Sequence, residues 1–374
     1  MPFMTQNTAN ADCMPDTRWR QSFRRKLITW FERHRRDLPW RRTRDPYSVW
    51  LSEIMLQQTQ VTTVIPYYER FLSQFPTVRA LAAADEADVL RLWEGLGYYR
   101  RARQLHAAAQ KVVANHDGKF PQQFELIRAL PGIGRYTAGA IASIACGIAA
   151  PILEANTVRL YSRLLAYRGD VASKQGQELL WEFAGAILPQ RGAGDLNQAL
   201  MELGSLVCTP RDPKCDRCPV QSLCPTFAQG LQDVIPAAKK KPVFESVREA
   251  AIVVRKANKI LMRQRTMGER WAGMWDFVRF PILAQGGKEL TAELRKKIHD
   301  QTGIDAQPGE RITTIKHGVT RFRITLDCYD AKHVSGSAKE HDGAKLIWLT
   351  TQSLAEYPLS MTGRKLAKLL QAKL

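Results

Sequence analysis

The sequence lacks a long apolar run, a recognisable signal peptide and an internal repeat. A transmembrane helix needs about 20 consecutive apolar residues, so we expect none and no membrane partner. Without a signal peptide, we expect the protein in the cytoplasm, where disulfides are rare. With 374 residues, the chain is long enough for two domains, each with its own core.

Acidic residues are outnumbered by basic residues along the whole chain. There are 55 Lys and Arg against 36 Asp and Glu, a formal net charge of +19. Residues 1–242 hold 32 basic and 22 acidic residues, and residues 243–374 hold 23 and 14, so the excess is +10 and +9. A basic tail alone is therefore excluded. The charge favours a polyanion, bound with counterion release, over basic residues that only aid solubility.

Cysteine is scarce, but four of the seven cysteines lie within 17 positions: Cys208, Cys215, Cys218 and Cys224. Their gaps of six, two and five residues allow four thiolates to converge on one centre, which favours a [4Fe-4S] cluster. Zinc is the alternative, although its structural sites usually pair two Cys-x-x-Cys units and only one is present. Disulfides would need an oxidising compartment. The scattered cysteines are ordinary thiols: Cys13, Cys146 and Cys328.

The first half of the chain has the apolar periodicity of helices. From Trp19 to about Gly204, apolar residues recur at intervals of three and four, with breaks at Pro39, Pro76, Pro121, Pro151 and Pro189. We therefore expect an all-α domain over residues 18–226, after a disordered tail at 1–17.

The second half has a different pattern. Residues 227–242, which include Lys239, Lys240, Lys241 and Pro242, are expected to form a basic linker. Beyond it, residues 243–374 predict a small α+β domain with one helix at Glu289–Gln301. The strand-like runs are Ala250–Arg255, Lys259–Arg263, Arg321–Tyr329 and Leu346–Thr350.

A glycine-containing turn joins two predicted helices at Leu130–Thr137. Gly132 and Gly134 permit a sharp turn with a bare backbone, and the next helix offers unpaired N–H groups to an anion. Such a turn can bind a DNA phosphate without reading a base. A plain connection between helices is the alternative.

One glutamate is a candidate general acid. On a helix, Glu53 would share a face with Val49 and Trp50, and desolvation there would raise its carboxyl pKa. A proton would then be available at neutral pH for a leaving group. An ordinary exposed or capping glutamate is the alternative.

The turn and the cysteines together resemble the helix-hairpin-helix DNA glycosylases of the endonuclease III superfamily, and within it the adenine DNA glycosylase family. The resemblance runs from about Leu38 to Cys224 and includes Trp50–Gln60, Gly95–Tyr99 and Asn197–Gly204. The C-terminal domain resembles the Nudix-like module of that family more loosely, through Trp271–Phe277.

The resemblance implies a function in base excision repair. A monofunctional enzyme would hydrolyse the N-glycosidic bond of adenine mispaired with 8-oxoguanine or guanine in double-stranded DNA, as a monomer associated with the nucleoid. A glycosylase for another mismatched base, such as thymine opposite guanine, is one alternative. A catalytically weakened mismatch-binding protein is the other.

The resemblance also assigns catalytic positions, and one of them departs from the family. Glu53 matches the general acid, but the family motif Leu-Asp-Gly-Asn reads Leu153-Glu154-Ala155-Asn156 here. The extra methylene of Glu154 shifts its carboxylate by about 1 Å unless the backbone compensates, and such an error can cost ~100-fold in rate. We favour compensation over poor substitution or changed chemistry, because Asn156 is retained.

Tyr136 determines the predicted reaction type. Bifunctional relatives carry a lysine at this position, whose amine attacks the sugar and leads to strand cleavage. A phenol cannot form that imine, so we predict hydrolysis that leaves an abasic site.

The remaining implied positions contact DNA. Gln57 and Tyr98 would wedge into the gap left by a flipped base. Arg36, Leu38, Trp40 and Gln198 would surround the adenine. The other matched positions are Gln58, Thr59, Gly132, Gly134 and Arg135. For Arg36, Trp40 and Tyr98, ordinary surface or packing roles are the alternatives.

The C-terminal module departs from its relatives in two places. Nudix hydrolases hold metal with an Arg-Glu-x-x-Glu-Glu helix, whereas Glu293–Gly303 is rich in basic residues, so metal-dependent pyrophosphate chemistry is not expected. The family turn that inspects 8-oxoguanine, Phe-Ser-His, is matched after His317 by Val319-Thr320-Arg321. The aromatic is missing, and a simple phosphate contact by Arg321 is the alternative.

Overall fold

The computed structural model describes residues 14–237 and 243–372. Most of the predicted tail, Cys13 and Lys239–Pro242 lie outside these ranges. Contacts group the chain into two compact units. Unit 1 contains the described residues up to 82 and those of 107–237, and unit 2 contains residues 83–106 together with 243–372. Within the described residues, no helix is both long and apolar enough to cross a membrane.

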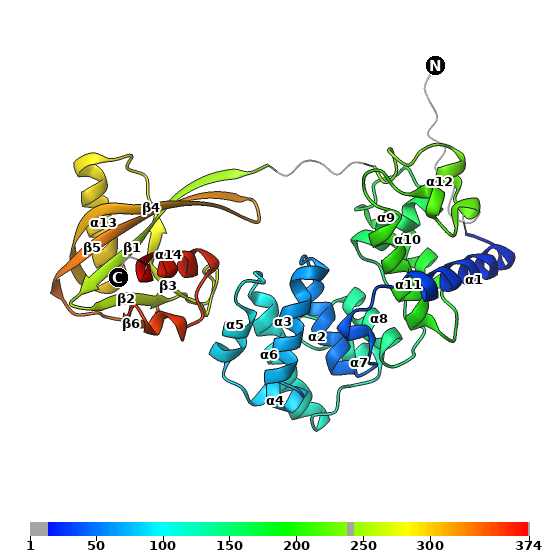
Figure 1. The fold of residues 1–374 in the computed structure, drawn as a ribbon, viewed down its shortest axis with the longest axis horizontal. Helices are drawn as coiled ribbons and strands as arrows, with labels where there is room; N and C mark the ends of the chain where they lie inside the picture. The colour runs from blue at the N-terminus through cyan, green and yellow to red at the C-terminus, as the bar shows by residue number, and fades with distance from the viewer. Residues whose placement is uncertain (1–13, 238–242, 373–374) are drawn as a thin grey trace, which may run out of the picture. The chain divides into compact units, whose positions relative to one another are not determined.

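Unit 1 is built from helices (Figure 1). Its α-helices are α1 Thr17–His34, α2 Pro46–Leu56, α3 Val61–Gln74, α4 Val78–Ala83, α7 Phe124–Arg128, α8 Arg135–Ile144, α9 Ala155–Leu164, α10 Lys174–Ile187, α11 Ala193–Leu206 and α12 Pro225–Ala228. Helix α6, Arg100–His116, begins in unit 2 and continues into unit 1. Short 3₁₀ turns lie at η1 Pro39–Arg41, η2 Cys215–Arg217 and η3 Gln221–Leu223.

Caps and prolines set the ends of these helices. Asp16 and Asp45 accept hydrogen bonds from the first turns of α1 and α2, which satisfies N–H groups that the helix leaves unpaired. Pro76, Pro121, Pro151 and Pro189 lie between α-helices and Pro39 opens η1, as predicted. Pro66 does not interrupt α3.

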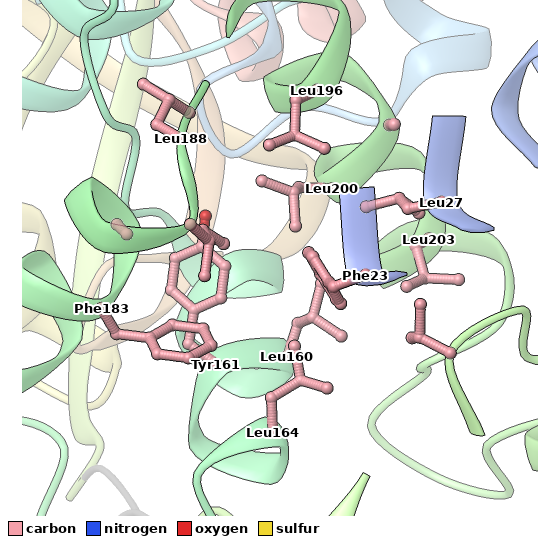
Figure 2. Packing of buried hydrophobic residues seen from close by; sticks show 14 of the residues in the cluster. Phe23, Leu27, Leu160, Tyr161, Leu164, Phe183, Leu188, Leu196, Leu200 and Leu203 are labelled. Atoms are coloured by element: carbon pink, nitrogen blue, oxygen red, sulfur yellow. The ribbon is translucent and has the colours of Figure 1, made fainter. Parts of the chain in front are cut away.

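The core of unit 1 joins α1 to α9, α10 and α11 (Figure 2). Phe23 and Leu27 of α1 pack with Leu160 of α9, Phe183 of α10 and Leu200 of α11. All five side chains are at most 2% exposed. Burial of this kind contributes about 25 cal/mol per Å² of apolar surface, so the core fixes where α9 and α11 present their polar residues.

Unit 2 contains a mixed six-stranded sheet in the order β4-β5-β1-β3-β2-β6. The pair β1–β5 is parallel and the other ladders are antiparallel. The strands are β1 Glu245–Lys256, β2 Lys259–Gln264, β3 Trp275–Pro281, β4 Ile304–Val319, β5 Phe322–Gly336 and β6 Leu346–Thr350. The helices are α5 Glu86–Trp93, α13 Gly287–Thr302 and α14 Met361–Gln371, with a 3₁₀ turn η4 at Ser353–Ala355.

Two helices cover opposite faces of this sheet. Ala251 and Val253 of β1 pack in one cluster with Leu366 of α14, whereas Ile252 of β1 packs in another with Leu294 of α13. Alternation along a strand sends successive side chains to opposite faces, so both faces are buried. The predicted helical domain followed by a small α+β domain is the observed fold.

Three elements of unit 2 escaped prediction. Strand β3 is buried along almost its whole length, so it shows no alternation. Strand β4 is polar and largely exposed. Helix α14 buries Leu366, Ala367 and Leu370 at helical spacing, and this spacing was the available signal. The predicted strand at Arg321–Tyr329 begins one residue later and extends to Gly336.

We predict that Leu200→Ala lowers the free energy of unfolding of unit 1 by about 2–5 kcal/mol, because it leaves a cavity beneath α9 and α11. Denaturant unfolding followed by circular dichroism measures the loss. Leu126→Ala is the control, since Leu126 is 41% exposed and should change stability little. Equal effects of the two variants would contradict this account of the core.

Candidate active site

A cavity of about 190 Å³ in unit 1 gathers the predicted catalytic and base-binding residues. Helices α2, α8 and α11, the turn η1 and the N-terminal end of α9 all contribute to its wall. The predicted residues that line it are Arg36, Leu38, Trp40, Glu53, Thr59, Tyr136, Glu154, Asn156 and Gln198. The cavity can hold one nucleobase.

Glu53 is buried in α2, with 5% of its surface exposed. The Tyr136 hydroxyl donates a hydrogen bond to Glu53 Oε2 at 2.7 Å. Burial raises the pKa of Glu53 to about 7, and the charge of Glu154 adds to this, while the Tyr136 hydrogen bond and Arg41 oppose it. Burial also keeps the Tyr136 pKa well above its usual range, so the phenol is a neutral donor. With a pKa of about 7, Glu53 is protonated in a substantial fraction of the molecules at neutral pH.

Glu154 caps helix α9. Its Oε1 accepts from the Thr157 N–H at 3.0 Å and its Oε2 from the Asn156 N–H at 2.9 Å, while the Thr157 hydroxyl accepts from the Glu154 N–H. This capping box leaves Ala155 as the first helical residue, where a positive φ is not needed. The replacement of the family glycine by Ala155 therefore introduces no backbone strain. Burial raises the pKa of Glu154, and the backbone donors oppose that rise.

Arg159 connects the N-terminal end of α9 to neighbouring segments through hydrogen bonds. Its guanidinium donates to Asn156 Oδ1 at 3.0 Å, to the Gly204 carbonyl at 2.7 Å and to the Cys208 carbonyl at 2.7 Å. The Asn156 amide in turn lies 3.3 Å from Glu154 Oε2. A Cβ on Gly204 would lie 2.8 Å from Asn156 Cβ, so only glycine allows α11 to approach this closely.

The cavity contains an ion pair that sequence reasoning missed. Glu202 of α11 is fully buried and accepts two hydrogen bonds from each of the guanidinium groups of Arg36 and Arg41, at 2.6–3.0 Å. These partners outweigh burial and hold its pKa at about 2. Glu202 lies four residues after Gln198 on a helix, and this spacing was the available signal.

Other predicted positions lie outside the cavity wall. Gln57 is the C-cap residue that follows α2, and Gln58 is exposed with a φ of 57°. Gly132 has a φ of 76°, which glycine adopts readily, and exposed Gly134 caps α8 without a side-chain bond. The Arg135 guanidinium stacks on Trp181 at 3.8 Å from the ring centroid.

In unit 2, the predicted residues occupy loops. Tyr98 is 49% exposed and has a φ of 50°. Thr320 and Arg321 form the turn between β4 and β5, where Thr320 has a φ of 51° and Arg321 lies 3.8 Å from Glu245. His317 is only partly exposed. Its ring accepts a hydrogen bond from the Arg279 guanidinium at 3.3 Å.

The four clustered cysteines line a second, apolar pocket of unit 1 with Leu160, Leu164, Val207 and Val220. The Arg163 guanidinium lies 3.3 Å from Cys208 Sγ. Burial raises the pKa of Cys218 to about 12, so thiolates here require positive charge at the centre of the pocket. Four cysteines that line one apolar pocket beside a guanidinium fit an iron–sulfur cluster.

The fold and the two sites define a class, a helix-hairpin-helix DNA repair protein with an iron–sulfur loop and a C-terminal Nudix-like domain. The model of the HhH-GPD superfamily base excision DNA repair protein matches residues 51–185. The iron–sulfur binding domain of endonuclease III matches residues 208–224, which begin and end on a clustered cysteine, and the NUDIX domain matches residues 249–369. The predicted fold class and [4Fe-4S] cofactor are confirmed.

Curated relatives identify the family. The chain is 32% identical to the adenine DNA glycosylase of Rattus norvegicus, over 92% of this chain and 77% of that protein. It is 36% identical to that of Buchnera aphidicola subsp. Schizaphis graminum, over 81% and 86%. The Homo sapiens protein is 47% identical over 62% of this chain, which spans 44% of its length. The chain belongs to the adenine DNA glycosylase family, as predicted.

Solved structures agree with the fold of the helical unit. A thermostable thymine-DNA glycosylase is 30% identical with a TM-score of 0.53, over 57% of this chain and 98% of that one. A trapped endonuclease III–DNA covalent intermediate shares the fold at 20% identity, with a TM-score of 0.50 over 58% and 100%.

We predict that the single-turnover rate of base excision falls as pH rises through about 7, because only protonated Glu53 can donate a proton. The Tyr136 hydrogen bond favours the ionised carboxylate, so Tyr136→Phe should raise the pKa of Glu53 and move this limb to higher pH. Rates measured between about pH 6 and 9 locate the limb. Tyr47→Phe is the control, since that buried hydroxyl binds the Phe75 carbonyl. A limb unmoved by Tyr136→Phe would assign it to another group.

Proposed function

We propose that this protein is a monofunctional glycosylase that removes adenine opposite 8-oxoguanine or guanine from double-stranded DNA. It acts as a monomer in the cytoplasm, on the nucleoid. The observation that carries the proposal is the pair of carboxyl groups in one cavity, Glu53 with its pKa at about 7 and Glu202 with its pKa at about 2. Environments that push two carboxyl pKa values apart assign one as an acid and the other as a permanent anion.

The cavity suits a purine with exocyclic and ring nitrogens. Leu38 and Trp40 give it apolar walls, and Gln198 offers an amide with both a donor and an acceptor. The ionised Glu202 already accepts two hydrogen bonds from each of the guanidinium groups of Arg36 and Arg41 and one from the Arg36 N–H, so it holds both arginines in the cavity wall. The amino group of adenine would donate to the amide oxygen of Gln198.

The reaction is a hydrolysis in which Glu53 is the acid. Glu53 donates its proton to a ring nitrogen of the flipped adenine, the C1′–N bond breaks with its electron pair leaving on the base, and an oxocarbenium-like sugar forms. Glu154, fixed by two backbone N–H donors, stabilises this cation as a carboxylate. Water then adds its hydroxide to C1′ and returns a proton to Glu53, which leaves an abasic site.

Tyr136 fits hydrolysis without strand cleavage. Its phenol donates to Glu53 and offers no amine for a Schiff base with the sugar. Its hydrogen bond orients the acid toward the cavity.

The remaining contacts hold the duplex. Gln57 and the exposed Tyr98 would fill the gap left by the flipped base. The bare backbone at Gly132 and Gly134 and the first turn of α8 would bind a phosphate. The turn at Thr320 and Arg321 would meet the strand opposite adenine.

Cys208, Cys215, Cys218 and Cys224 would hold the [4Fe-4S] cluster, which would brace the loop of residues 208–224 when bound. Three exposed basic residues of this loop would contact phosphates: Arg211, Lys214 and Arg217.

Thymine opposite guanine is a second candidate substrate, favoured by the 30% identity to the thymine-DNA glycosylase structure. Thymine would be bound less well than adenine, because it has no amino group to donate to the amide oxygen of Gln198.

We predict that Glu154→Gln reduces the single-turnover rate by at least about 100-fold and leaves duplex affinity nearly unchanged, because the amide loses the negative charge that stabilises the cation. Rapid-quench cleavage and fluorescence anisotropy measure the two quantities. Glu178→Gln is the matched control, since Glu178 is an exposed glutamate of α10 in an ion pair with Lys174. Undiminished cleavage by Glu154→Gln would remove this residue from the mechanism.

The substrate is tested with three duplexes that hold adenine opposite 8-oxoguanine, adenine opposite guanine, and thymine opposite guanine. We expect base release on the first two only, strand cleavage only after alkali treatment, and no adduct trapped by borohydride. Thymine release would favour the second candidate, and an efficient trapped adduct would contradict monofunctional hydrolysis. Binding without any release would support the weakened mismatch-binding alternative.

A further inference from the structure

The loop that carries Tyr98 has a fixed shape. Gly95, Gly97 and Tyr98 have φ values of 103°, 71° and 50°, in the region that most side chains avoid. Arg101 donates to the Leu96 and Gly97 carbonyls at 3.4 and 3.2 Å, and its guanidinium lies 5.4 Å from the Tyr98 ring centroid. The left-handed Tyr98 therefore persists because its surroundings hold it.

One end of this loop is anchored to helix α14 within unit 2. Glu94, at the C-terminal end of α5, accepts two hydrogen bonds from Arg364 at 2.6 and 2.9 Å and one from the Leu359 N–H at 3.2 Å. Arg364 also donates to the Leu354 and Tyr357 carbonyls, both at 2.7 Å. The pair is largely buried, at 21% and 15% side-chain exposure, and it is bidentate, which favours one geometry.

The flanking residues are anchored to the loop of residues 265–274. Arg103, in the first turn of α6, donates to the Ala272 carbonyl. Gly273 has a φ of 83°, and a Cβ there would lie 3.1 Å from Leu90 Cδ1 and 3.3 Å from Glu86 Oε1. Glycine thus lets the 265–274 loop lie directly against α5.

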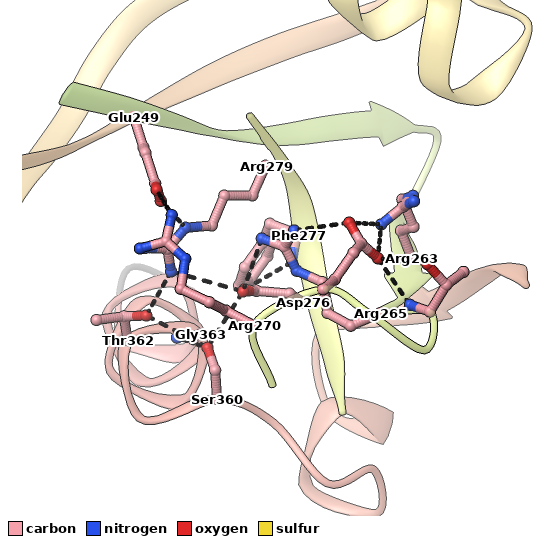
Figure 3. A network of polar contacts seen from close by, with 12 residues as sticks. Glu249, Arg263, Arg265, Arg270, Asp276, Phe277, Arg279, Ser360, Thr362 and Gly363 are labelled. Carbon is pink, nitrogen blue, oxygen red and sulfur yellow. Dashed lines mark hydrogen bonds and ion pairs between the residues drawn. The ribbon is translucent and has the colours of Figure 1, made fainter. Parts of the chain in front are cut away.

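A polar network lies between the start of α14 and the 265–274 loop, and Figure 3 shows its residues around Arg279 and Asp276. Arg279, 2% exposed, donates to Glu249 at 2.6 Å and to Thr362 at 2.9 Å. Ser360 donates to Asp276 at 3.2 Å. Thr362 and Ser360 form the start of α14, which carries Arg364.

The same network extends into the 265–274 loop. Arg270 donates to Glu249, and Glu269 accepts from Arg263 of β2 at 2.9 Å. Arg279 also lies under the Trp271 ring, 4.5 Å from its centroid. The elements that carry both anchors therefore contact one largely buried set of charges.

We propose that the C-terminal module positions the Tyr98 loop, with Glu94 and Arg364 as the positioning residues. This proposal rests on the proposed function of Tyr98 as the wedge. The C-terminal module, which would contact the strand opposite adenine, then also holds Tyr98 in position. Contact with the opposite strand and base extrusion are therefore coupled through the Glu94–Arg364 pair.

The test uses the full chain with Glu94→Arg, Arg364→Glu and the double variant that restores opposite charges. Hydrogen exchange of residues 95–103 reports the anchor, and fluorescence of 2-aminopurine beside the mispaired adenine reports extrusion. We expect each single variant to speed exchange and to lower the extruded fraction, both by about tenfold, and the double variant to recover part of each. Arg364→Gln, a milder change, should act in the same direction if Arg364→Glu fails to fold.

Two variants control for charge. Asp88→Arg makes the same charge change on the same helix, where Asp88 pairs with Arg91 at 54% and 51% exposure. Arg255→Glu makes the charge change of Arg364→Glu on β1, in a pair with Asp330 that is about two-fifths exposed. Both should exchange and extrude as the unmodified protein does. The proposal is overturned if Glu94→Arg behaves like Asp88→Arg, or if the double variant is no better than the worse single variant.

Tyr98→Ala separates this proposal from the proposed function. Reduced extrusion by Tyr98→Ala with normal adenine release from pre-flipped sites supports the wedge. If Tyr98→Ala extrudes normally, the wedge and the coupling both fall, whereas adenine excision by the cavity residues stands.

Discussion

The catalytic half of the molecule depends on how helix α9 begins. Glu154 satisfies the first N–H groups of that helix, so the cap needed for folding and the carboxylate facing the cavity are one group. Arg159, one turn along, binds the carbonyls of Gly204 and Cys208. Helix α11, the cysteine loop and the Glu154 carboxylate are therefore connected through the N-terminal end of α9. None of the three can shift without breaking a buried hydrogen bond, which costs about 1–3 kcal/mol.

Burial acts on each carboxyl of the cavity, and the neighbours decide the outcome. Glu53 has one neutral donor, Tyr136, so desolvation prevails and raises its pKa to about 7. Glu202 has two guanidinium groups, so it stays ionised although it is fully buried. Apolar surroundings alone would leave both carboxyl groups protonated. Two arginines beside each would leave both ionised. The charge of each carboxyl group is thus set by the residues beside it, including Arg41, which η1 places next to Glu202.

Much of this arrangement was predicted from the sequence, with the burial of Glu53 following from helical spacing and the roles of Tyr136 and Glu154 from the family resemblance. Glu53, Tyr136 and Glu154 were all predicted and line the same cavity. The Glu202 ion pair was missed, since its partners come from residues over 160 positions away. Strand β3 was missed because burial on both faces removes alternation, and β4 because its polarity hides it. The capping role of Glu154 involves only neighbouring residues, but it was recognised only from the backbone conformation at the start of α9.

The anchoring of α5 bears on how separable the parts of this protein are. A protein shortened after residue 226 would retain Leu90 and Glu94 but lose Gly273, Leu359 and Arg364. Leu90, now 1% exposed, would lose part of its apolar cover, and Glu94 would lose a bidentate partner. Sequence families divide the chain at its linker, whereas side-chain contacts cross that division inside unit 2. The family matches divide the chain into separate modules, but contacts between α5 and the residues after the linker join parts of both modules within unit 2.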